Sequence, residues 1–195
     1  MGSFINNKSA QKSMKIPNLV LMTGYPSAGK SQVSKYLVEE HGFTGLLIDD
    51  LRRELFGRGY LEMLNDGERG DQENQDTWRA LEWRKACGLI AGHNVVVDST
   101  AQDEYSRSVL FHTGVTTNNS LVYLQVSREE LTRRNAARGR VNDANAMWDE
   151  IWEEPKETGL YEILKFQNDT PKDQERIFRE LDQKFRTRRS LFWGF

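Results

Sequence analysis

Apolar and polar positions alternate in blocks along this 195-residue chain. Short, continuous apolar runs are typical of buried strands, and longer stretches with apolar residues every three or four positions are typical of helices. Five runs have the form of strands, and they cover residues 19–22, 43–48, 95–97, 121–126 and 163–166. Because helical stretches separate these runs, we expect an α/β fold of three layers, in which helices flank a five-stranded, mainly parallel sheet.

Two helices are predicted from apolar spacing after the second and fifth strands. The first follows a polar segment at 65–76, and its expected buried face consists of Ala80, Trp83, Cys87, Ile90 and Ala91. The last helix runs from about Pro171 to Arg186, with Pro171 in its first turn and Ile177, Phe178, Leu181 and Phe185 toward the core. Cys87 is expected to be a buried thiol, and a single cysteine excludes a disulfide framework.

The segment between the first strand and the first helix carries the most specific motif. It reads Gly24-Tyr25-Pro26-Ser27-Ala28-Gly29-Lys30-Ser31 and fits the phosphate-binding pattern G-x-x-x-x-G-K-[ST]. Such a loop turns N–H groups inward at a helix N-terminus, where partial positive charge favours phosphate. We expect a P-loop NTPase fold, with Lys30 at the β- and γ-phosphates of a nucleotide and Ser31 on Mg²⁺. The alternative is a glycine-rich turn with a chance Lys-Ser pair.

Acidic and basic residues follow the second strand directly, as Asp49-Asp50-Leu51-Arg52-Arg53. Ligands of open α/β sheets bind at the carboxyl ends of the strands, so a carboxylate there can take the proton of an attacking hydroxyl. Arg52 can pair with a phosphate or carboxylate of the acceptor. The alternative is a helix N-terminus with Asp49 or Asp50 as its cap and both arginines in surface ion pairs. The spacing does not distinguish Asp49 from Asp50 as the base.

The third strand ends in Asp98-Ser99-Thr100. Its form is that of a Walker B strand, in which the aspartate helps to hold Mg²⁺ or its waters, although the same position in small kinases often touches the acceptor. We therefore keep Asp98 as both a metal and an acceptor residue, and Thr100 as an acceptor residue. Ser99 or Thr100 could also simply cap the next helix.

A basic helix is predicted after the fourth strand. Ser127 and Glu130 form a capping-box pattern at its start, and Arg134 and Arg138 lie four positions apart on one face. Neighbouring cations favour an anionic partner, so we expect a lid over residues 128–156 whose arginines neutralise charge on a transferred phosphoryl group. A solvated basic face or an RNA-contacting patch is the alternative. Trp148 and Trp152 within this stretch are expected to pack in the core rather than to stack on a base.

Composition and charge limit the functions that this fold could have. The formal net charge of −2 argues against bulk attraction to nucleic acid, so any such contact needs a local basic patch. We expect a disordered tail without a signal peptide over residues 1–15 and one kinase domain over residues 16–190. Residues 191–195 are expected to form an aromatic tail that docks on the body or on a partner. We expect a cytoplasmic protein without a membrane span. The three histidines follow no metal-ligand spacing, and no pattern indicates an oligomeric state.

These stretches together resemble the P-loop kinases of the polynucleotide-kinase and zeta-toxin group, which are relatives of adenylylsulfate and gluconate kinases. The resemblance covers the chain from about Leu19 to Phe185 and is carried by GYPSAGKS, Asp49 to Arg52, VVVDST and Arg134-Asn135-Ala136-Ala137-Arg138-Gly139. The combination of the acid–acid–x–Arg segment with the RNxxRG lid looks most like the kinase domain of phage-type 5′-hydroxyl polynucleotide kinase.

The resemblance implies roles for individual residues. Asp49 corresponds to the general base, Arg52 to the contact with the acceptor's phosphate, and Asp98 to an acceptor-side carboxylate. Arg134 and Arg138 correspond to the nucleotide-binding and transition-state arginines of the lid. The implied nucleotide contacts in and after the loop come from Gly24, Ser27, Ala28, Gly29, Lys30, Ser31 and Gln32.

The chain departs from the pattern of this group in three respects. Gln32 stands where the group usually has Thr, which alters an α-phosphate contact, and no phosphatase domain accompanies the kinase. The acids after the lid (Asp143, Asp149, Glu150, Glu153 and Glu154) are unlike a broad nucleic-acid groove. The sequence therefore predicts a kinase that uses ATP or another nucleoside triphosphate with Mg²⁺ and phosphorylates a nucleic-acid or nucleotide 5′-hydroxyl. The alternatives are a small-metabolite kinase, and a nucleotide-dependent switch that binds its partner through the tail at 191–195.

Overall fold

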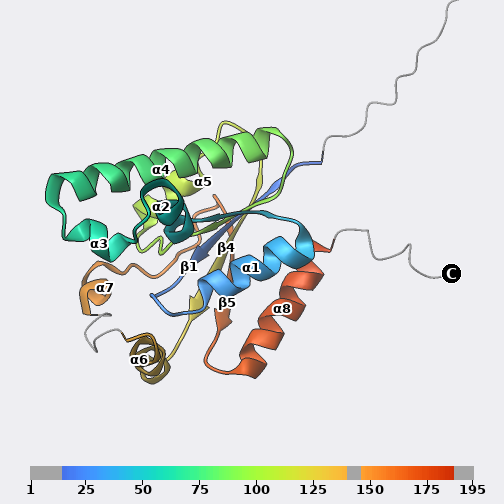
Figure 1. The fold of residues 1–195 in the computed structure, drawn as a ribbon. Helices are drawn as coiled ribbons and strands as arrows, with labels where there is room; N and C mark the ends of the chain where they lie inside the picture. Colours follow the sequence, from blue (N-terminus) through green and yellow to red (C-terminus); the bar gives the residue numbers. More distant parts are fainter. Residues whose placement is uncertain (1–14, 140–145, 187–195) are drawn as a thin grey trace, which may run out of the picture.

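A single parallel sheet forms the centre of the molecule (Figure 1). The computed structural model describes residues 15–139 and 146–186. Within them the sheet has the order β2-β3-β1-β4-β5, and every neighbouring pair is parallel. The strands are β1 (Asn18–Thr23), β2 (Thr44–Leu47), β3 (Val95–Asp98), β4 (Asn118–Gln125) and β5 (Glu162–Gln167). The expected α/β fold with five strands is confirmed. The tails predicted at 1–15, apart from Lys15, and at 191–195 lie outside the described residues.

Helices cover both faces of this sheet, which explains why its strands read as continuous apolar runs. One face packs against α1 (Lys30–His41) and α8 (Pro171–Phe185), and the other against α2 (Ile48–Phe56), α4 (Gly67–Ile90) and α5 (Glu104–Phe111). Side chains of β1 alternate between the two cores, with Leu19 and Leu21 in one and Val20 and Met22 in the other. The remaining helices are α3 (Tyr60–Leu64), α6 (Arg128–Ala137) and α7 (Ala146–Ile151), and they lie toward the carboxyl ends of the strands (Figure 1).

The last helix forms as the sequence predicts. Thr170 caps α8 in a capping box with Asp173, Pro171 occupies the first turn, and Ile177, Leu181 and Phe185 are buried. The second strand, by contrast, is shorter than the expected 43–48, because Ile48 already begins α2. Asp49 and Asp50 therefore lie in a first helical turn, where the helix dipole favours negative charge.

The buried face predicted for the helix before β3 is wrong except at Ala80, which is partly buried against the core. Trp83 and Ile90 are 69% and 73% exposed, and Cys87 is exposed as well, so its thiol is not buried. The polar segment at 65–76 instead belongs largely to α4, whose buried residues recur every three or four positions as Gly70, Glu73, Thr77, Leu81, Lys85 and Leu89. Polar side chains are tolerated on this face because they find partners: Thr77 donates to the Glu73 carbonyl, and Lys85 donates to the Leu110 carbonyl.

None of the helices within 15–139 and 146–186 is long and apolar enough to cross a membrane.

Candidate active site

The phosphate-loop motif lies between β1 and α1, as predicted. Gly24 and Gly29 have positive φ angles of 144° and 97°, and a Cβ on either would lie within 2.6 Å of the Leu124 carbonyl or of the Asn168 amide, respectively. Only glycine fits both positions. Gly29 is the N-cap of α1 and contributes no side-chain cap, so the positive end of the helix dipole is left to an external anion. The loop residue Ala28 is buried, whereas Ser31 and Gln32 at the start of α1 are exposed.

Lys30, Ser31 and Asp98 converge at the carboxyl edge of β1 and β3. Lys30 donates from Nζ to the carbonyls of Gly24 (2.7 Å) and Tyr25 (3.0 Å). Asp98 is only 6% exposed; burial raises its pKa, while the Lys30 charge and a hydrogen bond with the Ser31 side chain oppose this rise. The Asp49 and Asp50 charges raise the pKa of Asp98 further, so all of these groups share one electrostatic environment.

The donor set in this environment fits a magnesium ion. A hydroxyl and a carboxylate suit Mg²⁺, which keeps several waters and takes further oxygens from substrate phosphates. No group of three or more His, Cys, Asp or Glu side chains in the described residues could hold a metal ion by itself. Ser31 and Asp98 would therefore hold the ion together with waters and a nucleotide rather than in a protein cage.

The two acid–arginine pairs that follow β2 lie in different environments. Arg52 is 6% exposed and donates from Nη1 to Asp49 at 2.7 Å. Its Nη2 donates to Asn74 of α4 at 3.1 Å, and its guanidinium carbon lies 4.7 Å from the ring centroid of Tyr60. The Nε of Arg52 is buried without a hydrogen-bond partner, which marks an available donor.

Asp50 and Arg53 form the outer of these two pairs. Their ionic groups are 3.3 Å apart, and both side chains are more than 60% exposed. The alternative of a surface ion pair therefore describes Asp50 and Arg53, and it does not describe the buried Arg52. Both acids are exposed, Asp49 at 60% and Asp50 at 64%, so the feature that separates them is the partner: Asp49 pairs with the buried Arg52 and Asp50 with the exposed Arg53.

Several side chains of the basic helix α6 and its C-cap contact the phosphate loop at Ser27, and Arg128 at the start of α6 lies 6.0 Å from the ring centroid of Tyr25 in the same loop. Ser27 has a φ of 68°, and its hydroxyl donates to Asn135 at 2.6 Å. Arg138 donates to the same hydroxyl at 3.3 Å, and Arg134 donates to the Ser27 carbonyl at 3.3 Å. The two arginines expected to share a helix face thus both reach the loop. The other half of the predicted capping box is missing, because Glu130 pairs with Arg133 and Arg134 instead.

The loop after β3 is held by residues that the sequence reading did not single out. Thr23 at the end of β1 donates to the carbonyls of Thr100 (2.9 Å) and Ala101 (3.0 Å). Arg107 of α5 is fully buried and also donates to the Ala101 carbonyl, at 3.0 Å. Asp103 caps α5, so the alternative in which Ser99 or Thr100 caps this helix is wrong. These bonds fix the backbone that follows Asp98.

An aromatic contact joins the phosphate loop to the segment after α7. The rings of Tyr25 and Trp152 are 4.8 Å apart, and Trp152 also lies 5.8 Å from the Tyr123 ring. The Tyr25 hydroxyl donates to Asp149, which also pairs with Arg128. Burial and the Asp149 hydrogen bond raise the pKa of Tyr25 to about 12, so this hydroxyl stays a donor at physiological pH.

Four residues of the site lacked a clear sequence signal. Asn135 lies inside the RNxxRG stretch, but the motif did not indicate a role for it. Asn74, Arg107 and Asn168 had no motif; Asn168 is 4% exposed and donates to the Ala28 carbonyl at 2.8 Å. The one sequence feature that could have pointed to these residues is a polar side chain at a core position of a helix or at the end of a strand.

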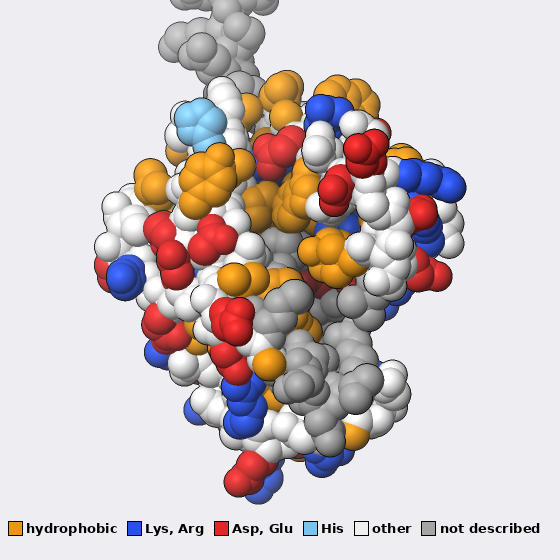
Figure 2. All heavy atoms as spheres, turned by 90° about the vertical axis from the view of Figure 1, so that its left-hand side faces the viewer, with side chains coloured by type: hydrophobic (Ala, Val, Ile, Leu, Met, Phe, Trp, Pro, Cys, Tyr) orange, Lys and Arg blue, Asp and Glu red, His pale blue; other side chains and the backbone are white. Residues whose placement is uncertain are grey.

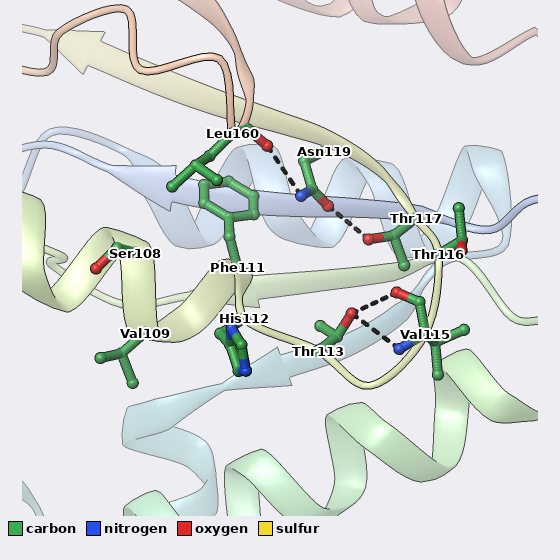
Figure 3. Close-up of a pocket in the computed structure, with 10 residues that line it drawn as sticks. All are labelled: Ser108, Val109, Phe111, His112, Thr113, Val115, Thr116, Thr117, Asn119 and Leu160. Carbon is green, nitrogen blue, oxygen red and sulfur yellow. Dashed lines mark hydrogen bonds between the residues drawn. The ribbon is translucent and has the colours of Figure 1, made fainter.

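A hollow of about 500 Å³ lies away from this site, beyond the end of α5 and the start of β4 (Figure 3). Three of its polar side chains already have partners within the wall. Thr113 donates to the Val115 carbonyl, Thr117 to Asn119, and Asn119 to the Leu160 carbonyl. It holds none of the residues that the sequence predicted for the site.

Comparison with known proteins places the fold. A family described as an AAA domain matches residues 19–157. The structure is similar to a sugar kinase from Janibacter sp. HTCC2649, with a TM-score of 0.65 and 15% identity over 86% of this chain and 93% of that one. It is similar to a gluconokinase from Sinorhizobium meliloti 1021, with a TM-score of 0.60 and 19% identity over 87% and 96% of the two chains.

A third similarity is to a chain of the Pnkp1/Rnl/Hen1 complex. The TM-score is 0.52 with 22% identity, and the match covers 61% of this chain and 39% of that one. No curated protein matches the sequence. At these identities the likeness establishes the P-loop kinase fold.

Proposed function

Because the chain belongs to the AAA-domain family that matches residues 19–157, we propose that it is a kinase that transfers the γ-phosphate of ATP, or of another nucleoside triphosphate, to a hydroxyl group. One observation carries the proposal: the Asp49–Arg52 pair at 2.7 Å lies in the same electrostatic environment as Lys30 and Asp98. A nucleotide switch needs a phosphate loop but no acceptor base. A kinase needs both.

Residues of the phosphate loop and of α6 form the donor half of the proposed site. The N–H groups at the start of α1 and the Lys30 ammonium bind the phosphates, and Arg134 and Arg138 add positive charge from α6. Bound at Ser31 and Asp98, Mg²⁺ would neutralise charge on the phosphates. Ser27 donates to Asn135 and accepts from Arg134 and Arg138, and these three hydrogen bonds tie this half together.

The acceptor half acts as a base and an anchor. Asp49 accepts the proton of the acceptor hydroxyl while that oxygen forms its bond to the γ-phosphorus; the bond from the γ-phosphorus to the bridging oxygen breaks, and the nucleoside diphosphate leaves. Arg52 holds Asp49 in place through Nη1, and its positive charge favours an anionic group of the acceptor beside it.

Our first candidate acceptor is a nucleotide or nucleic-acid 5′-hydroxyl. A phosphate next to the reacting sugar is an anion that the Arg52 guanidinium can attract in addition to Asp49, and the sequence resemblance to polynucleotide kinases points the same way. A small metabolite such as a sugar acid is the second candidate, and the similarity to sugar kinase and gluconokinase structures favours it.

A screen with ATP labelled at the γ-phosphate tests the proposal. Oligonucleotides and nucleoside 3′-phosphates are compared with a set of sugar acids and polyols. Label in a 5′-phosphate, with an apparent affinity that falls steeply as salt rises, supports a polynucleotide acceptor. Label in a small acid supports the second candidate. Slow ATP hydrolysis without any labelled acceptor contradicts both and favours a switch, whose expected partner contact at 191–195 lies outside the described residues.

A further inference from the structure

One buried residue outside every sequence motif contacts both the phosphate loop and helix α6. Asn168 follows β5 directly and is 4% exposed. Its backbone N–H donates to the Gln125 carbonyl at the end of β4, and its own carbonyl accepts from Arg134 Nη2 at 2.7 Å. Its side-chain amide donates to the Ala28 carbonyl at 2.8 Å. Asn168 therefore joins three segments that meet at the carboxyl edge of the sheet.

Buried carbonyls of the phosphate loop need donors from elsewhere in the fold. Such a loop turns its N–H groups toward the anion, so its carbonyls point outward into the protein. Lys30 donates to two of these carbonyls and Arg134 to a third. Ala28 is 1% exposed, and its carbonyl accepts from Asn168. Leaving a buried carbonyl without a donor costs free energy, so this bond holds the loop in the shape that it has.

The bond to Ala28 also sets the direction of the next N–H group. The peptide between Ala28 and Gly29 is trans, and in a trans peptide the carbonyl and the N–H point in opposite directions. Because Asn168 binds the carbonyl, the Gly29 N–H points away from Asn168. Gly29 is the N-cap of α1, so this N–H lies beside the positive end of the helix dipole.

Gly29 leaves the space that the Asn168 amide occupies. A Cβ on Gly29 would lie 2.5 Å from the Nδ2 atom of Asn168, too close for any side chain. This position therefore requires glycine for its φ of 97° and for the approach of the amide. The amide lies directly against the peptide whose carbonyl it binds.

Asn168 offers a ligand almost no surface of its own. Figure 2 views the side of the molecule that carries α3 and α7, and the surface there is hollowed at its centre. Ligands of parallel sheets bind at the carboxyl ends of the strands, where these helices lie. Because Asn168 is buried, an effect of its side chain on a bound phosphate passes through the loop.

We propose that Asn168 is a positioning residue of the donor half, whose side chain fixes the Ala28–Gly29 peptide with its N–H toward the bound phosphate. The backbone carbonyl of Asn168 aims Arg134 at the same loop. This inference rests on the proposed binding of a nucleoside triphosphate at residues 24–31. Mutation separates the two contacts, because a change of side chain removes the first and retains the second.

Calorimetric titration with the Mg²⁺ complexes of tripolyphosphate and of ATP measures the effect on affinity. Asn168→Ala removes the donor, and Asn168→Ser keeps a shorter one. Gln167→Ala is the matched control, because Gln167 is the adjacent amide, is exposed and donates to Asp169. We expect Asn168→Ala to raise both Kd values by about 10- to 150-fold, the range for a lost hydrogen bond to a charged group. A smaller rise is expected in Asn168→Ser, and none in Gln167→Ala.

Nuclear magnetic resonance observes the Gly29 N–H itself, which a merely structural role of Asn168 would not alter. Labels on the alanine carbonyl carbon and the glycine nitrogen select glycines that follow an alanine, and this sequence has two, Gly29 and Gly92. We expect saturating Mg²⁺-tripolyphosphate to move the Gly29 amide proton downfield in the wild type and in Gln167→Ala, and to move it less in Asn168→Ala. Gly92, which donates to the Leu89 carbonyl at the end of α4, should not move.

The outcomes separate this inference from the proposed function. Equal Kd values and equal Gly29 shifts in Asn168→Ala and the wild type overturn the role of Asn168 and leave the kinase proposal standing. The expected pattern without phosphorylation of any acceptor supports Asn168 while the kinase proposal fails. A wild type that does not bind tripolyphosphate overturns both. Circular dichroism checks that each variant is folded, and Asn168→Ser decides the comparison if Asn168→Ala does not fold.

Discussion

Asp49 and Asp50 are adjacent and chemically identical, yet only Asp49 contacts a buried arginine. Asp50 pairs with Arg53 in solvent, where ion pairs contribute little. We predict that Asp49→Asn lowers kcat by about 10²- to 10⁴-fold, the usual loss when a general base is removed, and leaves the affinity for ATP unchanged. Steady-state kinetics with the acceptor found in the screen measure the loss, and calorimetry measures ATP affinity.

Asp50→Asn is the matched control for this prediction. It removes the same charge one position away, and we expect kcat within about threefold of the wild type because an exposed pair is readily replaced by water. If Asp50→Asn loses as much activity as Asp49→Asn, the charge of the segment matters and the contact with Arg52 does not.

Glu130 provides a pH-dependent contribution to stability. Hydrogen bonds from Arg133, followed by those from Arg134, lower the pKa of this carboxyl to about 2. A carboxyl whose folded pKa lies below its unfolded value stabilises the fold fully above the unfolded pKa of about 4.3, and this stabilisation is lost as pH falls toward 2. We predict that Glu130→Gln lowers the unfolding free energy at pH 7 and that the difference from the wild type shrinks between pH 5 and pH 2. Urea unfolding at several pH values measures it; a difference that grows as pH falls contradicts the assignment.

Helix α4 shows how a residue's type can mislead about its burial. Leu81 is fully buried, whereas Trp83, two positions on, is 69% exposed. We predict that Leu81→Ala lowers the unfolding free energy by about 2–5 kcal/mol, as expected when a core side chain is truncated, and that Trp83→Ala changes it by less than about 0.5 kcal/mol. Urea unfolding followed by circular dichroism compares the two. If Trp83→Ala lowers the unfolding free energy more than Leu81→Ala does, Trp83 is on the buried face, as the sequence pattern predicted.

Strands β1 and β3 and the middle of β4 were predictable because both of their faces are buried, so that nearly every position carries the signal. The edge strands β2 and β5 are only partly buried. The buried face of helix α4 was not predictable, because Lys85 and Thr77 occupy core positions where only their hydrogen-bond partners make a polar side chain acceptable. The same limit applies to the site. The segment from Gly24 to Ser31 is marked by local backbone demands, whereas the pairing of Asp49 with a buried Arg52 involves Asn74, which lies on another helix and accepts a hydrogen bond from that arginine.

Sheet order brings the site together from distant parts of the chain. With β1 between β3 and β4, the phosphate loop lies between the segments that follow those strands. Ser27 contacts Asn135, and Thr23 contacts Thr100, across more than 70 residues of sequence in each case. Parallel strands all present their carboxyl ends at one edge, which is why groups separated in sequence act on one ligand.

Binding at such a shared site should stabilise the whole molecule. A ligand present at one hundred times its dissociation constant adds about 2.7 kcal/mol to the unfolding free energy, which for a chain of this size raises Tm by roughly 5–10 °C. We predict this rise with ATP and Mg²⁺ in the wild type, a smaller rise when Mg²⁺ is chelated, and none in Lys30→Ala at the same ATP concentration. Lys35→Ala is the matched control, because Lys35 lies on α1 but is exposed. Thermal unfolding with and without nucleotide measures the shifts. An equal rise in Lys30→Ala and Lys35→Ala would mean that the nucleotide binds away from the loop, and the donor half of the site would have to be located elsewhere.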